Sequence, residues 1–313
     1  MALKPSFDPG LTSKYMGALL RAINKDGSFN VRRKGFRKWA GSAYLRLVTM
    51  TWPRFLTVVT LYYLAANTVF AWIYQLIGED TLHVTERDLG LSGFARAFFF
   101  SAQTLTTVGY GSVYPFGMAA HLVAALEGAI GLMGFALATG LLFARFSRPS
   151  ARLVFSERAL MAPLRDGTQS LQFRIANERS NVLMEVEAAV MLMTVERGAN
   201  GALQRNFVEL ALERKRIFFL ALTWTVVHPI DETSPLWGKT GEDLKNMQAE
   251  LLILIKCFDD AFSQVVHRRY SYTFDEIEWS ARFATVFEVT AAGHLELDLE
   301  RVGAIEKIAV EEV

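Results

Sequence analysis

The chain has 313 residues, enough for two domains of ordinary size, and 51% of them are hydrophobic. A formal net charge of +1 gives no overall attraction for nucleic acid, so we expect no nucleic-acid partner. The single cysteine, Cys257, excludes an intramolecular disulfide and a paired-cysteine metal site, and its apolar surroundings favour a core role over the alternative of a reactive thiol.

An amphipathic basic helix is predicted near the start of the chain, at about 38–50. Its apolar residues recur at i, i+4, i+7 and i+8, which places them on one helix face. Pro53 follows, and we expect the helix to break there, before a long apolar run. A basic amphipathic helix beside such a run is typical of the membrane interface. The shared face consists of Ala40, Tyr44, Leu47 and Val48.

Two apolar runs are long enough to cross a bilayer. The first, Phe55–Ile77, is free of charge, and its length as a helix spans a hydrocarbon core of about 30 Å. The second, at about 116–144, carries one carboxylate, Glu127, which at membrane depth must face protein or water. The sequence leaves open whether Glu127 bonds to neighbouring helices or faces a water-filled cavity. Glycines in this run permit bending, and we predict a hinge at Gly131, Gly134 or Gly140.

A third apolar segment, at 94–106, lies between the two spans and is too short to cross the membrane. We therefore predict a re-entrant helix. Non-helical backbone at this depth survives only where protein or a water-filled cavity surrounds it. A span, a short helix, an irregular strand and a second span together define a pore-loop architecture.

The residues after the short helix, 107–111, have the sequence TVGYG, the signature of potassium selectivity filters. A dehydrated cation needs several carbonyls pointing at one axis, and glycine helps because it accepts φ > 0. We predict that K⁺ is bound by the carbonyls of Thr107, Val108, Gly109 and Tyr110 and by the Thr107 hydroxyl, with Gly111 completing the filter. The side chains of Val108 and Tyr110 are expected to brace the loop against the short helix.

One chain supplies one such loop, so a closed ring requires a homotetramer. Flanking charges predict the orientation, because lysine and arginine concentrate on the cytoplasmic side. The segment up to Arg54 is strongly basic, and the connection around Glu79 and Asp80 is acidic. We expect a multi-pass protein of the inner or plasma membrane with both termini in the cytoplasm. Arginines expected near lipid headgroups are Arg54, Arg145, Arg148 and Arg152.

From residue 151 onward, short strand patterns alternate with turn signals, which favours an antiparallel β-sandwich. A short helix is predicted near 242–247, with Thr240 as its cap. Acidic clusters at 259–260 and 275–278 are interpreted as a solvated face, with a cation vestibule as the alternative. No catalytic or nucleotide-binding motif occurs, so we expect neither an enzyme nor a cofactor. The predicted strands are 170–176, 185–195, 205–212, 217–227, 250–258, 262–272, 281–289 and 294–299.

Several motifs resemble the prokaryotic inward-rectifier potassium channel family, often called KirBac. The resemblance covers almost the whole chain and implies a two-transmembrane-helix pore-loop channel with an all-α membrane domain and a cytoplasmic immunoglobulin-like β-sandwich. The implied domains are 1–53, 54–146 and 147–313. The motifs are Trp52-Pro53-Arg54, Phe98–Ser101, Thr107–Gly111, Phe143–Pro149, His228–Asp231 and Ser234–Leu236.

The resemblance also implies a gate on the second span. Phe135, Thr139 and Phe143 share one helix face, and Phe143 matches the constriction position of the family. A ring of phenylalanines there would close the pore by dewetting, whereas packing between subunits is the alternative. Phe135 falls where strong rectifiers carry a carboxylate, so we expect only weak block by Mg²⁺ or polyamines.

Further expectations from the family concern lipid and the filter brace. Anionic lipid is an expected partner, and the prokaryotic relatives suggest that phosphoinositide inhibits. Eukaryotic relatives brace the filter with a Glu–Arg pair, but Gln103 and Ser112-Val113 stand at these places here, so other packing must brace it. Two rival functions remain: a nonselective cation channel, and a membrane-anchored sensor that conducts no ion.

Overall fold

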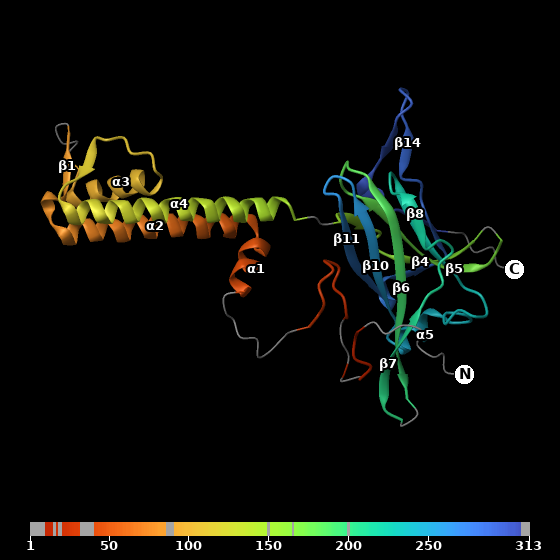
Figure 1. The fold of residues 1–313 in the computed structure, drawn as a ribbon. Helices are drawn as coiled ribbons and strands as arrows, with labels where there is room; N and C mark the ends of the chain where they lie inside the picture. Colours follow the sequence, from red (N-terminus) through yellow and green to blue (C-terminus); the bar gives the residue numbers. More distant parts are fainter. Residues whose placement is uncertain are drawn as a thin grey trace. The chain divides into compact units, whose positions relative to one another are not determined.

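The computed structural model describes residues 10–14, 17, 21–31, 41–85, 91–148, 151–164, 166–198 and 201–307. It consists of two compact units (Figure 1). The pore unit comprises residues 35–148, and the β unit comprises residues 1–34 and 149–313.

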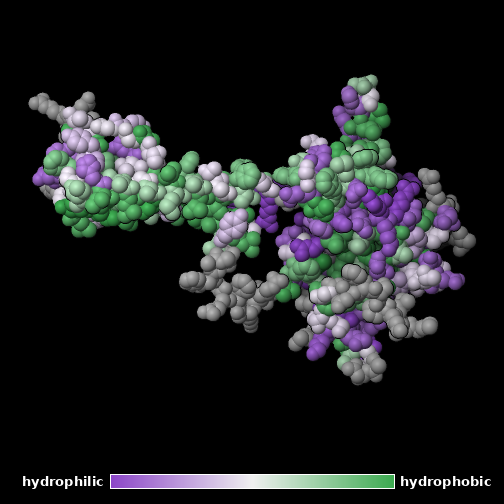
Figure 2. Space-filling view, viewed as in Figure 1, coloured by the Kyte–Doolittle hydropathy of each residue, from purple (hydrophilic) through white to green (hydrophobic). Residues whose placement is uncertain are grey.

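The pore unit is built on two long helices, α2 and α4, which lie side by side (Figure 1). Both are long and apolar enough to cross a membrane, and only 17% and 11% of their most apolar windows are buried. A core helix of a soluble protein would be mostly buried, so these faces suit lipid or partner chains. Hydrophobic side chains cover the visible surface of both helices (Figure 2). The helices are α1 (Gly41–Thr49), α2 (Trp52–Ile77), α3 (Gly93–Leu105) and α4 (Met118–Phe146).

The short helix α3 packs against α2 and α4 and forms with them the core of the pore unit. Tyr74 and Phe100 meet edge to face at 5.2 Å between ring centroids, which adds specific geometry to apolar burial. The Ser92 side chain caps α3 by accepting a hydrogen bond from the Ala95 amide. The buried core residues are Phe70, Ala71, Tyr74, Leu82, Ala97, Phe100 and Leu105.

The predicted break between the amphipathic helix and the first span is confirmed, but it falls a few residues before Pro53 and not at the proline itself. The helix α1 ends at Thr49, and Pro53 lies in the first turn of α2, with Thr51 as the N-cap. A proline is tolerated there because the first helical amides have no intrahelical acceptor. Residues 38–40 of the predicted helix lie outside the described residues.

An all-α pore unit is expected from the family resemblance, but the structure also contains a short two-stranded sheet there. Strands β1 (Leu82–Val84) and β2 (Val113–Pro115) pair antiparallel and join the connection after α2 to the segment that follows the filter. The Thr85 hydroxyl also donates to the carbonyls of Gly111 (3.2 Å) and Ser112 (2.9 Å). These bonds fix the end of the filter segment to the preceding loop.

The β unit is a sandwich of two five-stranded sheets whose facing side chains form one core. One sheet has the order β11-β10-β6-β7 with β8 beside β6, and the other has β12-β4-β5-β3 with β9 beside β5. Two small two-stranded sheets, β13-β16 and β14-β15, are added. The strands are β3 (Leu153–Phe155), β4 (Ala159–Pro163), β5 (Gln169–Asn177), β6 (Leu183–Arg197), β7 (Leu203–Glu209), β8 (Arg216–Phe219), β9 (Thr223–Pro229), β10 (Glu250–Asp259), β11 (Gln264–Thr273), β12 (Ile277–Trp279), β13 (Ala281–Phe283), β14 (Phe287–Val289), β15 (Leu295–Leu297) and β16 (Ile305–Lys307).

Two of the predicted strands each correspond to two separate strands in the structure. The apolar run 217–227 contains β8 in one sheet and β9 in the other, because the chain crosses the sandwich near the buried Leu220. The run 281–289 likewise divides into β13 and β14. A continuous apolar run hides such a crossing, since both sheets require buried residues. The predicted short helix is confirmed as α5 (Gly241–Asn246), with a capping box between Thr240 and Asp243.

Candidate ion pathway

The backbone after α3 alternates between left-handed and ordinary conformations. Thr107, Gly109 and Gly111 have φ of 61°, 54° and 79°. This alternation turns successive carbonyls toward one side, which an extended run of L-residues does not do. The sequence pointed to the two glycines but not to Thr107, because a β-branched residue rarely adopts positive φ.

Gln103 is the brace that the sequence left unidentified. Its side-chain Oε1 accepts a hydrogen bond from the Tyr110 amide at 2.9 Å. Its backbone carbonyl accepts from the amides of Val108 (2.9 Å) and Gly109 (3.2 Å). Gln103, an uncharged residue on the last turn of α3, therefore holds three consecutive filter residues, one through its side chain and two through its backbone carbonyl.

The expectation that Val108 and Tyr110 pack against the short helix is wrong within one chain. Their exposed fractions are 53% and 83%, so the chain itself does not cover them. Large apolar side chains left on a rigid, hydrogen-bonded loop are typical of a surface that another protein surface covers.

Glu127 faces protein, and this resolves the alternatives left open by the sequence. The carboxylate is fully buried and accepts hydrogen bonds from the hydroxyls of Tyr74 (2.7 Å) and Ser101. Ser101 also lies 3.0 Å from the Asn67 side-chain oxygen, and the Asn67 amide donates to the Tyr63 carbonyl. A polar network thus joins α2, α3 and α4, and it satisfies a carboxylate that lipid would not accept.

The three glycines predicted as hinges occupy different environments. A Cβ at Gly131 would lie 2.0 Å from the Leu105 carbonyl oxygen, so here α4 touches the end of α3 directly. A Cβ at Gly134 would lie 3.4 Å from the Tyr62 hydroxyl, and one at Gly140 would have no neighbour within 4 Å among the described residues. Close packing is therefore the evident role of Gly131.

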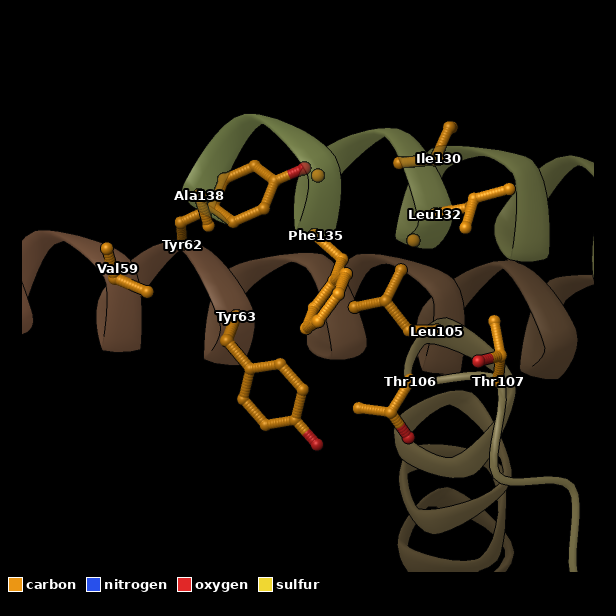
Figure 3. Close-up of a pocket in the computed structure, with 12 residues that line it drawn as sticks. Val59, Tyr62, Tyr63, Leu105, Thr106, Thr107, Ile130, Leu132, Phe135 and Ala138 are labelled. Atoms are coloured by element: carbon orange, nitrogen blue, oxygen red, sulfur yellow. The ribbon is translucent and has the colours of Figure 1, made fainter. Parts of the chain in front are cut away.

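A largely apolar cavity of about 320 Å³ lies between α2 and α4, at the foot of the filter. Figure 3 shows Phe135 and Leu132 from α4 and Tyr63 from α2 around this space. Leu105, Thr106 and Thr107 close one end of it, so Phe135 of the candidate gate face and the first filter residue border a common cavity. Phe135, Thr139 and Phe143 are all exposed in the single chain.

Arg145 is not available for lipid headgroups in the way that the sequence suggested. Its guanidinium donates to the carbonyls of Leu47 (2.5 Å) and Met50 (2.7 Å) and lies over the rings of Trp52 and Phe55. The end of a helix exposes unpaired carbonyls and negative dipole charge, which a cation stabilises. Arg145 therefore fastens α1 to α4.

The other predicted lipid arginines differ from Arg145. Arg54 and Arg148 are exposed, and Arg152, in the β unit, lies 3.7 Å from Glu178. Only Arg54 and Arg148 thus remain exposed without an interaction given by the described residues.

We expect Arg145→Gln to lower the free energy of unfolding by about 2 kcal/mol, the usual size for lost charge-assisted hydrogen bonds. Arg145→Lys should recover only part of this loss, because lysine lacks the planar fork and ring stacking. Thermal unfolding of the full-length channel in lipid-free detergent measures the effect, with Arg148→Gln as the control. A loss seen only when anionic lipid is added would contradict the structural role.

Other candidate residues have structural roles in the β unit. His228 lies between the Ala211 carbonyl (2.6 Å) and the Ser234 hydroxyl (2.8 Å), as a loop-stabilising side chain does. Burial raises the pKa of the Cys257 thiol to about 11, which favours the inert core residue. Among the described residues there is no cluster of metal-ligating side chains.

The acidic clusters are not a simple solvated face. Asp259 is buried and accepts from the Asn181 amide at 2.7 Å. Glu276 pairs with Arg21, and Glu278 pairs with Arg158. Most of these carboxylates therefore hold local structure, which the sequence could not indicate because their partners are far away along the chain.

Two membrane-length helices, a re-entrant helix, a loop of alternating φ and a β-rich domain define a two-span pore-loop ion channel. The family model "Inward rectifier potassium channel C-terminal domain" matches residues 153–313, and the model "Ion channel" matches residues 58–148. The chain belongs to the inward rectifier potassium channel family. It is thus a member of an ion-channel family and not an enzyme, and K⁺ is the permeant ion of that family.

Individual relatives agree with this assignment. The chain is 38% identical to inward rectifier potassium channel Kirbac3.1 from Paramagnetospirillum magnetotacticum, over 89% of this chain and 93% of the relative. It is 27% identical to ATP-sensitive inward rectifier potassium channel 12 from Bos taurus, over 85% and 67%. It is 29% identical to G protein-activated inward rectifier potassium channel 3 from Homo sapiens, over 85% and 72%.

Among solved structures, the sporulation control protein Spo0M from Bacillus subtilis aligns with 42% of this chain and 50% of its own, at 9% identity. The TM-score is 0.23, a similarity too low to define a fold.

Proposed function

We propose that four copies of this chain form a K⁺-selective pore, with residues 107–111 of each chain contributing one quarter of the filter. The observation that carries the proposal is the alternation of positive φ at Thr107, Gly109 and Gly111 on a loop held by Gln103. Carbonyls arranged in this way replace the water shell of a cation only when several loops meet on one axis. The exposed Val108 and Tyr110 would then pack between neighbouring subunits.

Rubidium uptake into liposomes that contain the purified chain tests this function. Barium-sensitive uptake that sodium does not match supports a selective pore, and equal permeability to both ions supports the nonselective alternative. Absence of any flux supports the membrane-anchored sensor. The mass of the complex in mild detergent tests the stoichiometry independently, since a monomer or dimer cannot close a ring of four loops.

The proposed gate is Phe143 on α4. Phe135, Thr139 and Phe143 lie on one face, and Phe143 is 71% exposed in the single chain, which leaves it available to meet its copies on the pore axis. Four such rings would exclude water and ions by dewetting. Gly134 and Gly140 remain candidates for the bending that opening requires, because α4 has more free space there than at Gly131.

Replacing the gate residue should increase leak. We expect Phe143→Ala to raise resting rubidium uptake several-fold, because a methyl side chain leaves the constriction too wide to exclude water and ions. Leu137→Ala is the matched control, since Leu137 is similarly exposed but lies on another face of the same helix. Unchanged or reduced leak in Phe143→Ala would support packing between subunits instead of a gate.

We also propose that the membrane lipid modulates the channel from the cytoplasmic side. The basic N-terminal segment supports cytoplasmic termini, and α1 suits the interface between water and lipid. The exposed Arg54 and Arg148 would attract anionic headgroups, each worth about 1 kcal/mol near such a surface. Following the family resemblance, phosphoinositide should inhibit, and Mg²⁺ or polyamine block should be weak. Higher flux in phosphoinositide-containing liposomes would contradict this proposal.

The domain assignment belongs to the same proposal. Residues 1–53 would be a cytoplasmic N-terminus, 54–146 the transmembrane pore domain and 147–313 the regulatory β-sandwich. Arg145 supports a mechanical link between the first two parts, because its bonds to the Leu47 and Met50 carbonyls join α1 to the cytoplasmic end of α4. Motion of the N-terminal segment would then reach the gate helix directly.

A further inference from the structure

The β unit contains a cavity of about 760 Å³, lined by both charged and apolar side chains, that is remote in sequence from the filter. One wall is an N-terminal strap, which we define as residues 21–31, and the others come from β6, β7, β10, α5 and the turn after β11. The charged side chains that line it are Arg21, Arg205, Lys245, Glu250, Asp275 and Glu276.

The strap is firmly seated on the sheet. The carboxylate of Glu250, itself buried, accepts hydrogen bonds from the amides of Ala22 (2.9 Å) and Ile23 (3.3 Å). The Ser271 hydroxyl donates to the Ile23 carbonyl at 2.5 Å. Gly27 has φ of +84°, and a Cβ there would lie 2.9 Å from the Arg269 carbonyl oxygen. The strap thus forms a fixed wall with its own buried anchor.

Arg205 on β7 is the unusual member of the lining. It is 91% buried, yet within the described part of the chain its guanidinium has neither a hydrogen-bond acceptor nor a carboxylate partner. Its guanidinium nitrogens are not sealed inside the protein, so a ligand, an ion or water can satisfy their hydrogen-bonding capacity. Because Arg205 borders the cavity, its free donors face a space that a ligand can enter.

The remaining charges favour a small anion. Glu276 is neutralised by Arg21 and by Lys25 at 2.8 Å, and both oxygens of Glu250 are occupied by strap amides. Burial also raises the pKa of Glu250, which reduces its repulsion of an anion. Arg205 and Lys245 therefore remain to attract an anion, while Asp275 would repel one of high charge.

We propose that this cavity binds a small oxyanion, such as the phosphate group of a metabolite or of a lipid headgroup, through Arg205 and Lys245. The planar guanidinium matches two oxygens of such a group, and the lysine ammonium adds a point charge. The strap residues Arg21, Asn24 and Asn30 line the same space, so occupancy stabilises the seated strap.

Titration of the full-length channel in lipid-free detergent with inorganic phosphate, at constant ionic strength, tests the site. We expect a calorimetric binding signal and a rise in melting temperature of about 3 °C at tenfold excess over Kd. Arg205→Leu should weaken binding at least about tenfold, the effect of losing a bidentate charged contact. Its melting temperature without phosphate should change little, because the described residues give the Arg205 guanidinium no hydrogen bond or ion pair to lose.

Two further variants keep the test decisive. Lys245 is exposed on α5, so we expect the Lys245→Gln variant to fold normally. This variant should weaken phosphate binding about fivefold. Arg214→Gln removes an exposed arginine outside the cavity and should bind phosphate like the unaltered channel. Two outcomes would overturn the proposal and mean that water alone fills the cavity. The first is that the unaltered channel does not bind phosphate. The second is that neither Arg205→Leu nor Lys245→Gln binds phosphate more weakly than the unaltered channel.

A competition experiment identifies the source of the phosphate group. In vesicles with phosphoinositide, a headgroup that occupies the cavity lowers the apparent affinity for free phosphate, and this loss disappears in Arg205→Leu. A soluble metabolite as the natural ligand leaves the affinity equal in vesicles with and without phosphoinositide. These readouts do not require conduction, so a failure of the proposed pore and a failure of this site are distinguishable.

Discussion

Gly109→Ala should abolish the preference for K⁺ over Na⁺. Gly109 has φ of 54°, and an L-residue in the left-handed region costs about 1–2 kcal/mol in each chain. Steric crowding is not the reason, because a Cβ there would meet nothing within 4 Å among the described residues. We expect alanine to pull the backbone toward negative φ and turn the neighbouring carbonyls away from the ion path. Relative uptake of rubidium and sodium into liposomes measures the result.

The matched control is Gly128→Ala. Gly128 also has free space around it among the described residues, but its backbone is helical, so alanine fits without strain. We expect this variant to keep its ion preference. A Gly109→Ala channel that still discriminates between the two ions would show that the loop does not coordinate them through its backbone.

Much of the filter's architecture can be predicted from the sequence. Length and apolarity predict the spans because a bilayer imposes a fixed thickness, and two glycines at alternate positions predict where φ is positive. The conformation of Thr107 was not predictable in this way, because its own preference opposes it. Here hydrogen bonding, from the Thr107 amide to the Thr104 carbonyl at 3.0 Å, accompanies a conformation that local propensity disfavours.

The contacts of individual side chains were harder to predict from the sequence than the helices and strands. The sequence did not decide whether Glu127 bonds to neighbouring helices or faces a water-filled cavity. Its hydrogen bonds with Tyr74 and Ser101, on two other helices, distinguish the two environments. Arg145 resembled any arginine beside a membrane, because positive charge is common on that side whatever each residue contacts. Its binding of the α1 carbonyls depends on the turn at Met50 and Thr51, a three-dimensional detail without a periodic signal.

In the β unit, patterns failed where strands change sheets or are very short. β3, β4, β12 and β16 were not predicted; apart from β4 they have only three residues each, too few for alternation to emerge. The parallel pairing of β12 with β4 also lacks a turn signal, since its strands are distant in sequence. The helix α5 was predictable because its cap and its acidic first turn are adjacent in the chain.

The second large effect is expected at Gly131, where packing and hinge roles make opposite predictions. A Cβ there would lie 2.0 Å from the Leu105 carbonyl oxygen and 2.7 Å from its carbon, both of them backbone atoms at the end of α3. Because no side chain can rotate away, Gly131→Ala must displace α3 or α4. We expect a loss of about 3 kcal/mol in the free energy of unfolding, at the upper end of ordinary overpacking, together with loss of flux.

Gly140→Ala provides the contrast within the same helix, because a Cβ there meets nothing within 4 Å among the described residues. Alanine favours helix over glycine by up to about 1 kcal/mol, so this variant should melt at the same temperature or higher. A hinge at Gly131 predicts a different pair of results: normal melting with altered opening. Thermal unfolding of both variants beside their rubidium uptake therefore separates the two roles, since only a packing contact couples the loss of stability to the loss of the pore.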